Sequence, residues 1–180
     1  ARRGTLVVGG SVFSYVQASN CGFSEYIVAA SGERGSGLGR QLFDARKASL
    51  DAQAQQHGQA QCNGLFIEVD SPERTPAELL EAECSTALDA RERLRIFEHL
   101  GFMRVDLAYV QPPLARGKQP VTYMDLLFAP WPPRAAVPAD WVLQTVAPVW
   151  QAWAPETAAA QVAQLRSEIG DGDVALLPLF

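Results

Sequence analysis

Hydrophobic positions near the start of the chain follow the pattern of two strands joined by a turn. Residues 5–17 are rich in β-branched and aromatic side chains, and the Gly9-Gly10 pair among them can bend or bulge a strand. Residues 23–30 form a second run of this kind, and residues 18–22, ASNCG, have the composition of a turn. We therefore predict an antiparallel hairpin that bends or bulges at the glycine pair.

The rest of the chain alternates between helical and extended patterns. Leu42, Phe43 and Leu50, for example, recur near one face of a helix. The predicted helices are residues 40–58, 75–83, 89–101, 141–153 and 156–169, and the further predicted strands are residues 64–70, 102–111 and 121–130. This order of strands and helices favours helices packed on a mixed sheet.

Composition indicates a globular chain. Of its 180 residues, 48% are hydrophobic and 19% are charged, and no apolar run reaches the roughly 20 residues that cross a membrane. From residue 131 prolines become frequent, so we predict a core of residues 1–130 followed by a linker and a C-terminal helical extension, residues 131–180. The net charge of −5 argues against nucleic acid and favours a cationic partner such as an amine.

The three cysteines, Cys21, Cys62 and Cys84, are widely spaced and lack any CxxC pattern. Structural disulfides and a zinc site are therefore not expected. We expect a reducing, cytoplasmic location.

Three glycines, Gly35, Gly37 and Gly39, directly precede the predicted helix of residues 40–58. The first N–H groups of a helix have no partner within it and lie at the positive end of its dipole, so they attract anions. Glycines let a phosphate approach these donors closely, and Arg34 can add charge-assisted hydrogen bonds. The cluster fits a pyrophosphate site, and it equally fits a flexible loop with a tight packing contact.

The two common nucleotide motifs do not fit this cluster. The dinucleotide fingerprint GxGxxG would need glycine where Arg40 stands, and no Gly-Lys-Ser/Thr tripeptide follows. The cluster resembles instead the acetyl-CoA signature R/Q-x-x-G-x-G/A of the GCN5-related N-acetyltransferase (GNAT) family, met here by Arg34, Gly37 and Gly39.

Three further segments extend this resemblance over residues 5–130. "EYIVAAS", residues 25–31, looks like the family's fourth strand, and "GLFIEVD", residues 64–70, looks like its fifth. "RIFEHLGF", residues 95–102, resembles the family's FYxxxGF segment. The strand and two helices with which the family begins do not precede residue 5, so the wall of the acceptor site that they build lies outside this sequence or is built otherwise.

The resemblance implies an α/β fold, a mixed and mostly antiparallel sheet flanked by helices, with acetyl-CoA as cosubstrate. The fourth and fifth strands would separate and admit the pantetheine arm beside Ile27, Val28 and Ala29. The pyrophosphate would lie on the loop and helix start that follow: Arg34, Gly35, Ser36, Gly37, Leu38 and Gly39. By residue type alone, the apolar positions of this strand are better explained as sheet core.

Acetyl transfer to an amine needs a base, because alkyl amines are mostly protonated at neutral pH. Glu25 and Glu68 are the candidate catalytic residues, since each lies in a largely apolar strand where desolvation would raise the pKa of its carboxyl group. Each could instead point outward or pair with an arginine. The tyrosine of the family's FYxxxGF segment, which commonly protonates the CoA thiolate, is replaced by Phe97, and no spacing selects another tyrosine.

The sequence thus predicts an N-acetyltransferase that moves an acetyl group from acetyl-CoA to a primary amine by direct attack in a ternary complex. The alternative is a noncatalytic acyl-CoA-binding or protein-interaction module of the same fold. We expect a small-molecule or peptide amine as acceptor, and neither nucleic acid, membrane nor metal as partner. Trp150 and Trp153, three apart on a predicted helix, fit core packing or a homodimer contact.

Overall fold

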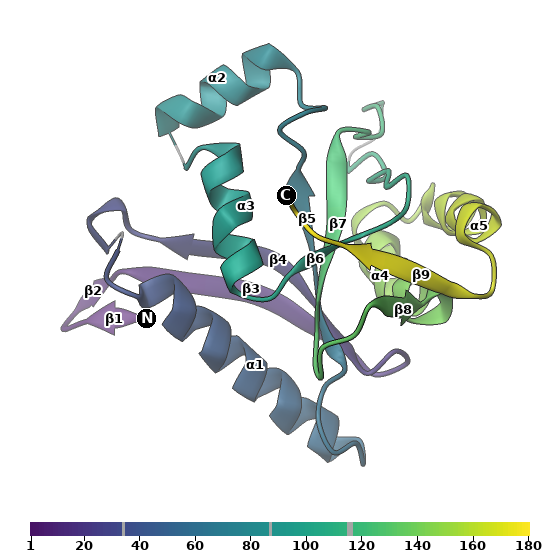
Figure 1. Ribbon diagram of the computed structural model, residues 1–180, viewed down its shortest axis with the longest axis horizontal. Helices are drawn as coiled ribbons and strands as arrows, with labels where there is room; N and C mark the ends of the chain where they lie inside the picture. The colour runs from purple at the N-terminus through teal and green to yellow at the C-terminus, as the bar shows by residue number, and fades with distance from the viewer. Residues whose placement is uncertain (34, 87, 115–116) are drawn as a thin grey trace.

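The computed structural model describes residues 1–33, 35–86, 88–114 and 117–180, and it has one large sheet with helices on both faces (Figure 1). Its strands are β1 (Arg2–Arg3), β2 (Leu6–Val7), β3 (Gly9–Val16), β4 (Cys21–Ala29), β5 (Gly64–Asp70), β6 (Met103–Val105), β7 (Met124–Pro130), β8 (Ala136–Pro138) and β9 (Asp173–Leu177). Its helices are the 3-10 helix η1 (Ser31–Glu33) and the α-helices α1 (Leu38–Gln56), α2 (Ala77–Thr86), α3 (Ala90–His99), α4 (Ala139–Trp153) and α5 (Ala158–Ile169).

The large sheet is mixed and mostly antiparallel. Its seven strands lie in the order β3-β4-β5-β7-β6-β9-β8, while β1 and β2 pair only with each other. Within the described residues, β4 and β5 are the only parallel neighbours, because α1 carries the chain back across the sheet between them. The fold class expected from the sequence is confirmed.

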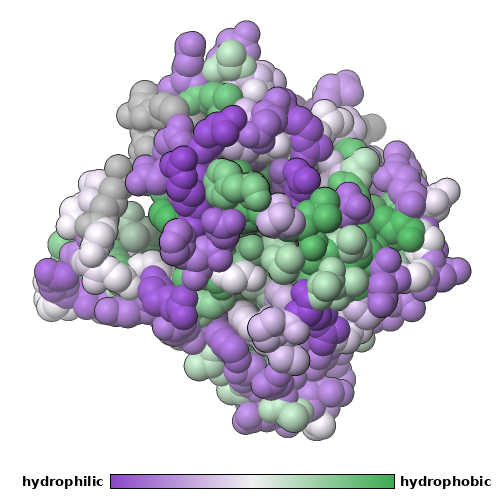
Figure 2. Space-filling model, viewed as in Figure 1, coloured by the Kyte–Doolittle hydropathy of each residue, from purple (hydrophilic) through white to green (hydrophobic). Residues whose placement is uncertain are grey.

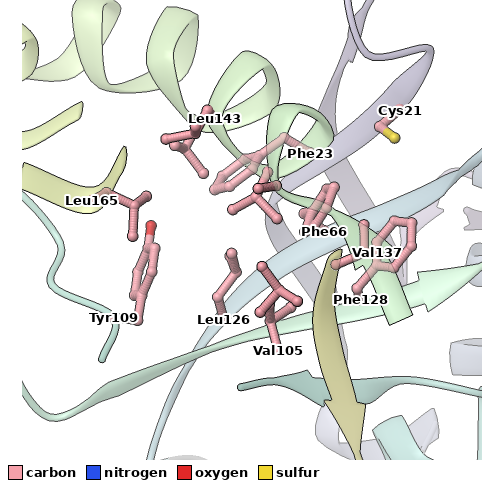
Figure 3. Close-up of a cluster of buried hydrophobic side chains, with 14 of the residues drawn as sticks. Cys21, Phe23, Phe66, Val105, Tyr109, Leu126, Phe128, Val137, Leu143 and Leu165 are labelled. Carbon is pink, nitrogen blue, oxygen red and sulfur yellow. The ribbon is translucent and has the colours of Figure 1, made fainter. Parts of the chain in front are cut away.

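Helices α1 and α3 cover one face of the sheet, and α4 covers the other. Alternate residues of β5 reach the two layers, because successive side chains of a strand point to opposite faces. Leu65 and Ile67 pack with Phe43 of α1, whereas Phe66 packs beneath α4. Figure 3 shows this second layer, in which aromatic and aliphatic side chains fill the space between the sheet and α4.

Helices α1 and α3, which lie toward the viewer in Figure 1, do not extend over β9. Figure 2 shows that polar side chains cover most of this face and that apolar side chains gather over β9 and the C-terminal end. None of the described helices combines the length and hydrophobicity that a membrane crossing requires.

The segment after residue 130 contains more than the expected linker and helices. Strands β8 and β9 pair with each other, and β9 pairs with β6, so they extend the main sheet. Helix α4 is rooted in the core, where Trp150 is 1% exposed. Strand β8 lies in the segment expected to start as a linker, because a strand of three residues that ends in proline is too short to show an alternating pattern.

The predicted hairpin is confirmed, but its details differ. Strand β3 begins at Gly9, where a Cβ atom would lie 2.8 Å from the carbonyl oxygen of Val28, so this glycine serves a close approach between strands rather than a bulge. The bulge lies farther along, at Glu25. The strand expected at residues 102–111 is also shorter, because only β6 joins the sheet before the chain turns away.

Candidate active site

Strands β4 and β5 pair over three residues and then separate. Their last paired residues are Ser24 and Ile67. Beyond this point β4 stays beside β3 as far as Ala29, and β5 stays beside β7 as far as Asp70. The sheet therefore opens between the two strands, where their backbone groups no longer bond across.

The two glutamates singled out by the sequence are the first residues after this separation. Glu25 is the extra residue of a β-bulge, because Val12 pairs with Tyr26 and the next residue of β3, Phe13, pairs with Ser24. Glu68 follows Ile67 on β5. Both line one cleft of about 410 Å³, whose walls are Ser24, Glu25, Tyr26, Glu68, Gln111, Leu114, Met124 and Trp153.

Hydrogen bonds hold the carboxyl group of Glu68. The Tyr109 hydroxyl donates to Oε1, and Gln111 Nε2 donates to Oε2 at 2.6 Å. The Trp150 indole N–H in turn donates to the Tyr109 hydroxyl at 3.2 Å. Burial raises the pKa of Glu68 above its usual value, while the donated hydrogen bonds lower it. Glu68 is thus neither turned outward nor paired with an arginine in the described structure.

Glu25 is held more loosely. Its Oε1 accepts a hydrogen bond from the Ser14 hydroxyl at 3.3 Å across the β3–β4 pair. The bulge changes the direction in which β4 presents its side chains, and it brings this second carboxylate to the cleft wall.

A buried arginine supports β4 where the strands separate. Arg46 of α1 donates to the Ser24 hydroxyl and, at 3.4 Å, to the Ser11 hydroxyl of β3. Its side chain is buried, and desolvation lowers the pKa of the guanidinium to about 10. Among the described residues, its Nε and second terminal nitrogen have no hydrogen-bond partner. Arg46 therefore fixes the position of Ser24 at the cleft wall, a role that its neighbours in the sequence, Ala45 and Lys47, do not reveal.

The glycine loop is open to solvent, as a diphosphate site requires. Gly35 and Gly37 have positive φ angles of 75° and 80°, which L side chains rarely adopt. A Cβ atom at Gly35, Gly37 or Gly39 would meet nothing within 4 Å. Ser36 is exposed, while Leu38 is buried and anchors the first turn of α1. Arg34 lies outside the described residues.

The three β4 residues expected beside a pantetheine arm lie beyond the last pair with β5. Val28 is 62% exposed, Ala29 is also exposed and Ile27 is half-buried. The interpretation of Val28 and Ala29 as sheet core is therefore wrong. Their backbone lies on the open side of the sheet beside the glycine loop.

Phe97 belongs to the core and not to the cleft. It is 5% exposed and packs edge-on against Phe102, with ring centroids 5.3 Å apart. Among the described tyrosines, Tyr26 lines the cleft directly, whereas the Tyr109 hydroxyl reaches it through Glu68. Burial raises the pKa of Tyr109, so it acts as a hydrogen-bond donor at neutral pH.

Neither of the two cysteine side chains that the structure describes offers a nucleophile at this site. Cys21 and Cys62 are free and buried, and burial raises the pKa of the Cys62 thiol to about 11. The side chain of Cys84 lies outside the described part of the chain. No group of three or more histidine, cysteine or acidic side chains within the described residues is placed to hold a metal ion.

Sequence reasoning missed the residues that position Glu68. Tyr109 and Gln111 are two apart in a run predicted as a strand, a spacing that puts both on one side of an extended chain. Trp150 and Trp153 were expected in the core or at a dimer contact. Trp150 is indeed in the core, while Trp153 forms a wall of the cleft.

Comparisons with known proteins give structural neighbours only. No model of a protein family matches the chain, and no curated protein matches it either. Solved structures that match include a GNAT-family protein from Bacteroides thetaiotaomicron, with 14% identity, a TM-score of 0.47, and coverage of 93% of this chain and 68% of that one. The ribosomal-protein-S18-alanine N-acetyltransferase of Escherichia coli matches with 14% identity, a TM-score of 0.43, and coverage of 72% and 64%.

An aminoglycoside 6'-N-acetyltransferase complexed with coenzyme A matches with 17% identity, a TM-score of 0.47, and coverage of 74% of this chain and 72% of that one. The structural neighbours are thus GNAT-family acetyltransferases at low sequence identity.

Proposed function

We propose that this chain is an N-acetyltransferase that moves an acetyl group from acetyl-CoA to a primary amine in a ternary complex. One observation carries the proposal: β4 and β5 separate after Ser24 and Ile67, and the next residue of each strand is a glutamate that lines the cleft. An opening in a sheet with carboxylates at its apex suits an amine that must lose a proton while it reacts.

The residues beside this opening fit acetyl-CoA. The open loop of Gly35, Ser36 and Gly37 leads into α1, whose Gly39 and Arg40 N–H groups have no backbone partner among the described residues. Such groups suit a diphosphate at the positive end of a helix dipole. The exposed edge of Ile27, Val28 and Ala29 suits the amide groups of a pantetheine arm, as an added strand would pair there. Arg34, which precedes this loop in the sequence, is proposed to add charge-assisted hydrogen bonds to the diphosphate.

Glu68 is the proposed base. Acetyl-CoA supplies an acetyl group activated as a thioester. The carboxylate of Glu68 accepts the ammonium proton, directly or through one water molecule, and the neutral amine attacks the acetyl carbon. The raised pKa of Glu68 makes it a stronger base than an exposed carboxylate. Glu25 adds negative charge that draws the ammonium group into the cleft.

The C–S bond breaks as the amide forms, and the leaving thiolate takes, through solvent water, the second proton that the attacking nitrogen loses. Phe97 has no proton to give, and a thiolate is a good enough leaving group to depart without a side-chain acid.

The test is release of CoA from acetyl-CoA with a panel of primary amines. Glu68→Gln keeps the size of the side chain and removes the base, so we expect kcat to fall about a hundredfold or more while KM for acetyl-CoA stays unchanged. Glu98→Gln, on the outer side of α3, is the matched control and should keep the full rate.

An equal rate in Glu68→Gln and the parent chain would contradict the role of Glu68. The noncatalytic alternative is favoured by the loss of the family's tyrosine at Phe97. It predicts that acetyl-CoA raises the thermal unfolding midpoint while no amine releases CoA.

A further inference from the structure

A second hollow lies next to the cleft and shares two of its walls. Its volume is about 300 Å³, and Leu114 and Trp153 line both spaces. The other described residues of its lining are Pro113, Gly117, Lys118, Ala154, Pro155, Glu156 and Thr157. The two spaces therefore adjoin at Leu114 and Trp153, and we call them together the groove; its glutamates lie on the cleft side of these two residues.

The shared wall has a fixed part and an uncovered part. Trp153 ends α4 and packs edge-on against the buried ring of Phe23, with ring centroids 5.7 Å apart. Leu114 is 53% exposed. A rigid aromatic ring opposite an uncovered leucine gives an apolar surface that a ligand can bury at little cost in side-chain order.

The two ends of the groove differ in charge. The cleft carries two carboxylates, Glu25 and Glu68, and no described cation lines it. The described lining of the second hollow includes one cation and one anion, Lys118 and Glu156. The cleft is therefore complementary to a cation, and the side chains of Leu114 and Trp153 are complementary to an apolar remainder.

We propose that the acceptor is a primary amine with an extended apolar body, of the size of hexylamine or phenethylamine. Its ammonium group lies in the cleft, and its body runs between Leu114 and Trp153 into the second hollow. This inference rests on the proposed function for the reaction, but it concerns binding and can be tested without turnover. A short amine would leave the shared wall in water.

The test is a nuclear magnetic resonance titration of the full chain with ethylamine, butylamine and hexylamine in the absence of acetyl-CoA. We expect the dissociation constant to fall roughly fourfold for each methylene group that is buried. The indole N–H signal of Trp153, identified by its loss in Trp153→Phe, should move with hexylamine. Equal dissociation constants for the three amines would overturn the proposal.

A matched pair of leucine variants locates the effect. Leu114→Ala should weaken hexylamine binding about threefold or more and leave ethylamine binding unchanged. Leu79→Ala removes a similarly exposed leucine, on α2 and outside both linings, and should change neither. Because both side chains are largely exposed, neither variant is expected to unfold. Equal hexylamine binding by Leu114→Ala and the parent chain would overturn the proposed path of the body.

Turnover separates this inference from the proposed function. Release of CoA with the same kcat/KM for ethylamine and hexylamine would overturn the inference and leave the transferase standing. Length-dependent binding without CoA release with any amine would support the groove and overturn the transferase.

Discussion

Two opposing effects act on the pKa of the Glu68 carboxyl group. Its buried position raises the pKa of the carboxyl group, and the hydrogen bonds donated by Tyr109 and Gln111 lower it. A base works best when its pKa lies near the working pH, so in the proposed reaction this balance sets the pH at which activity rises. Trp150 takes part without touching the cleft, because its indole N–H orients the Tyr109 hydroxyl.

Removal of the Tyr109 hydroxyl should therefore move the acid limb of the pH profile. In Tyr109→Phe the Glu68 carboxylate loses a stabilising donor, so its pKa rises further and the enzyme needs a higher pH to hold Glu68 ionised. We expect the acid limb of kcat/KM to shift upward by about 1 pH unit, since a hydrogen bond to a charged group contributes ~1.5 kcal/mol or more. The measurement is the pH dependence of CoA release with one amine in parent and variant.

Tyr15→Phe is the control for this change. It also removes a tyrosine hydroxyl that donates to a side chain, Asn20 Oδ1 at 2.8 Å. Tyr15 lies on β3 and does not line the cleft. An acid limb that moves downward in Tyr109→Phe, or equally in both variants, would show that the hydroxyl does not act through Glu68.

At the scale of elements, the N-terminus of α1 has glycines whose roles can be separated. Gly37 has a positive φ angle and caps the helix, so a side chain there is strained whatever it binds. Gly39 lies within the first turn, without a positive φ angle and with open space around its Cβ position. A structural role alone therefore gives no reason for glycine at position 39.

Gly39→Ala should accordingly stabilise the chain and weaken acetyl-CoA binding. Alanine in a helix is favoured over glycine by ~0.5–1 kcal/mol, so the free energy of unfolding should rise by about that amount. A methyl group beside the N–H donors hinders the approach of a diphosphate, and we expect the dissociation constant of acetyl-CoA to rise about tenfold, or ~1.4 kcal/mol. Denaturant unfolding and calorimetric titration measure the two effects.

Gly172→Ala provides the comparison, because that glycine also has open space and no positive φ angle but lies before β9, far along the chain from the loop. It should leave acetyl-CoA binding unchanged. Unaltered binding in Gly39→Ala would place the diphosphate elsewhere.

Local patterns were sufficient to predict most elements but not their long-range partners. Strand β5 occupies the predicted residues, and α3 begins close to the predicted position, where the Asp89 side chain accepts hydrogen bonds from the N–H groups of Arg91 and Glu92. Both features depend on neighbours in sequence. The two glutamates singled out by the sequence line one cleft, and their catalytic role stays a prediction. The donor from Tyr109 to Glu68 spans 41 positions, and no periodicity encodes such a contact. Strand β9 was missed because its pattern is short and its partners, β6 and β8, are themselves brief.

At the scale of the whole molecule, the last 50 residues, 131–180, complete the core on which the site rests. Val142, Val146 and Trp150 of α4 lie in one buried cluster with Phe23, Phe66 and Phe128 of the sheet. The same helix supplies Trp153 to the cleft and the indole that orients Tyr109. The position of Glu68 thus depends on residues that follow β7 in the chain.

A chain ending at residue 130 should therefore not fold cooperatively. It would expose the aromatic side chains beneath α4. Full burial of each such side chain contributes ~1.5–3 kcal/mol to the free energy of unfolding. The loss of several of them is large against a total free energy of unfolding of about 5–15 kcal/mol. We expect no near-ultraviolet circular dichroism signal and no sharp thermal transition in the fragment. A chain ending at residue 178 keeps every strand and helix and should retain both. A sharp transition in the shorter fragment, with acetyl-CoA binding intact, would show that residues 1–130 fold alone, and the influence of α4 on Glu68 would then be confined to orientation of Tyr109.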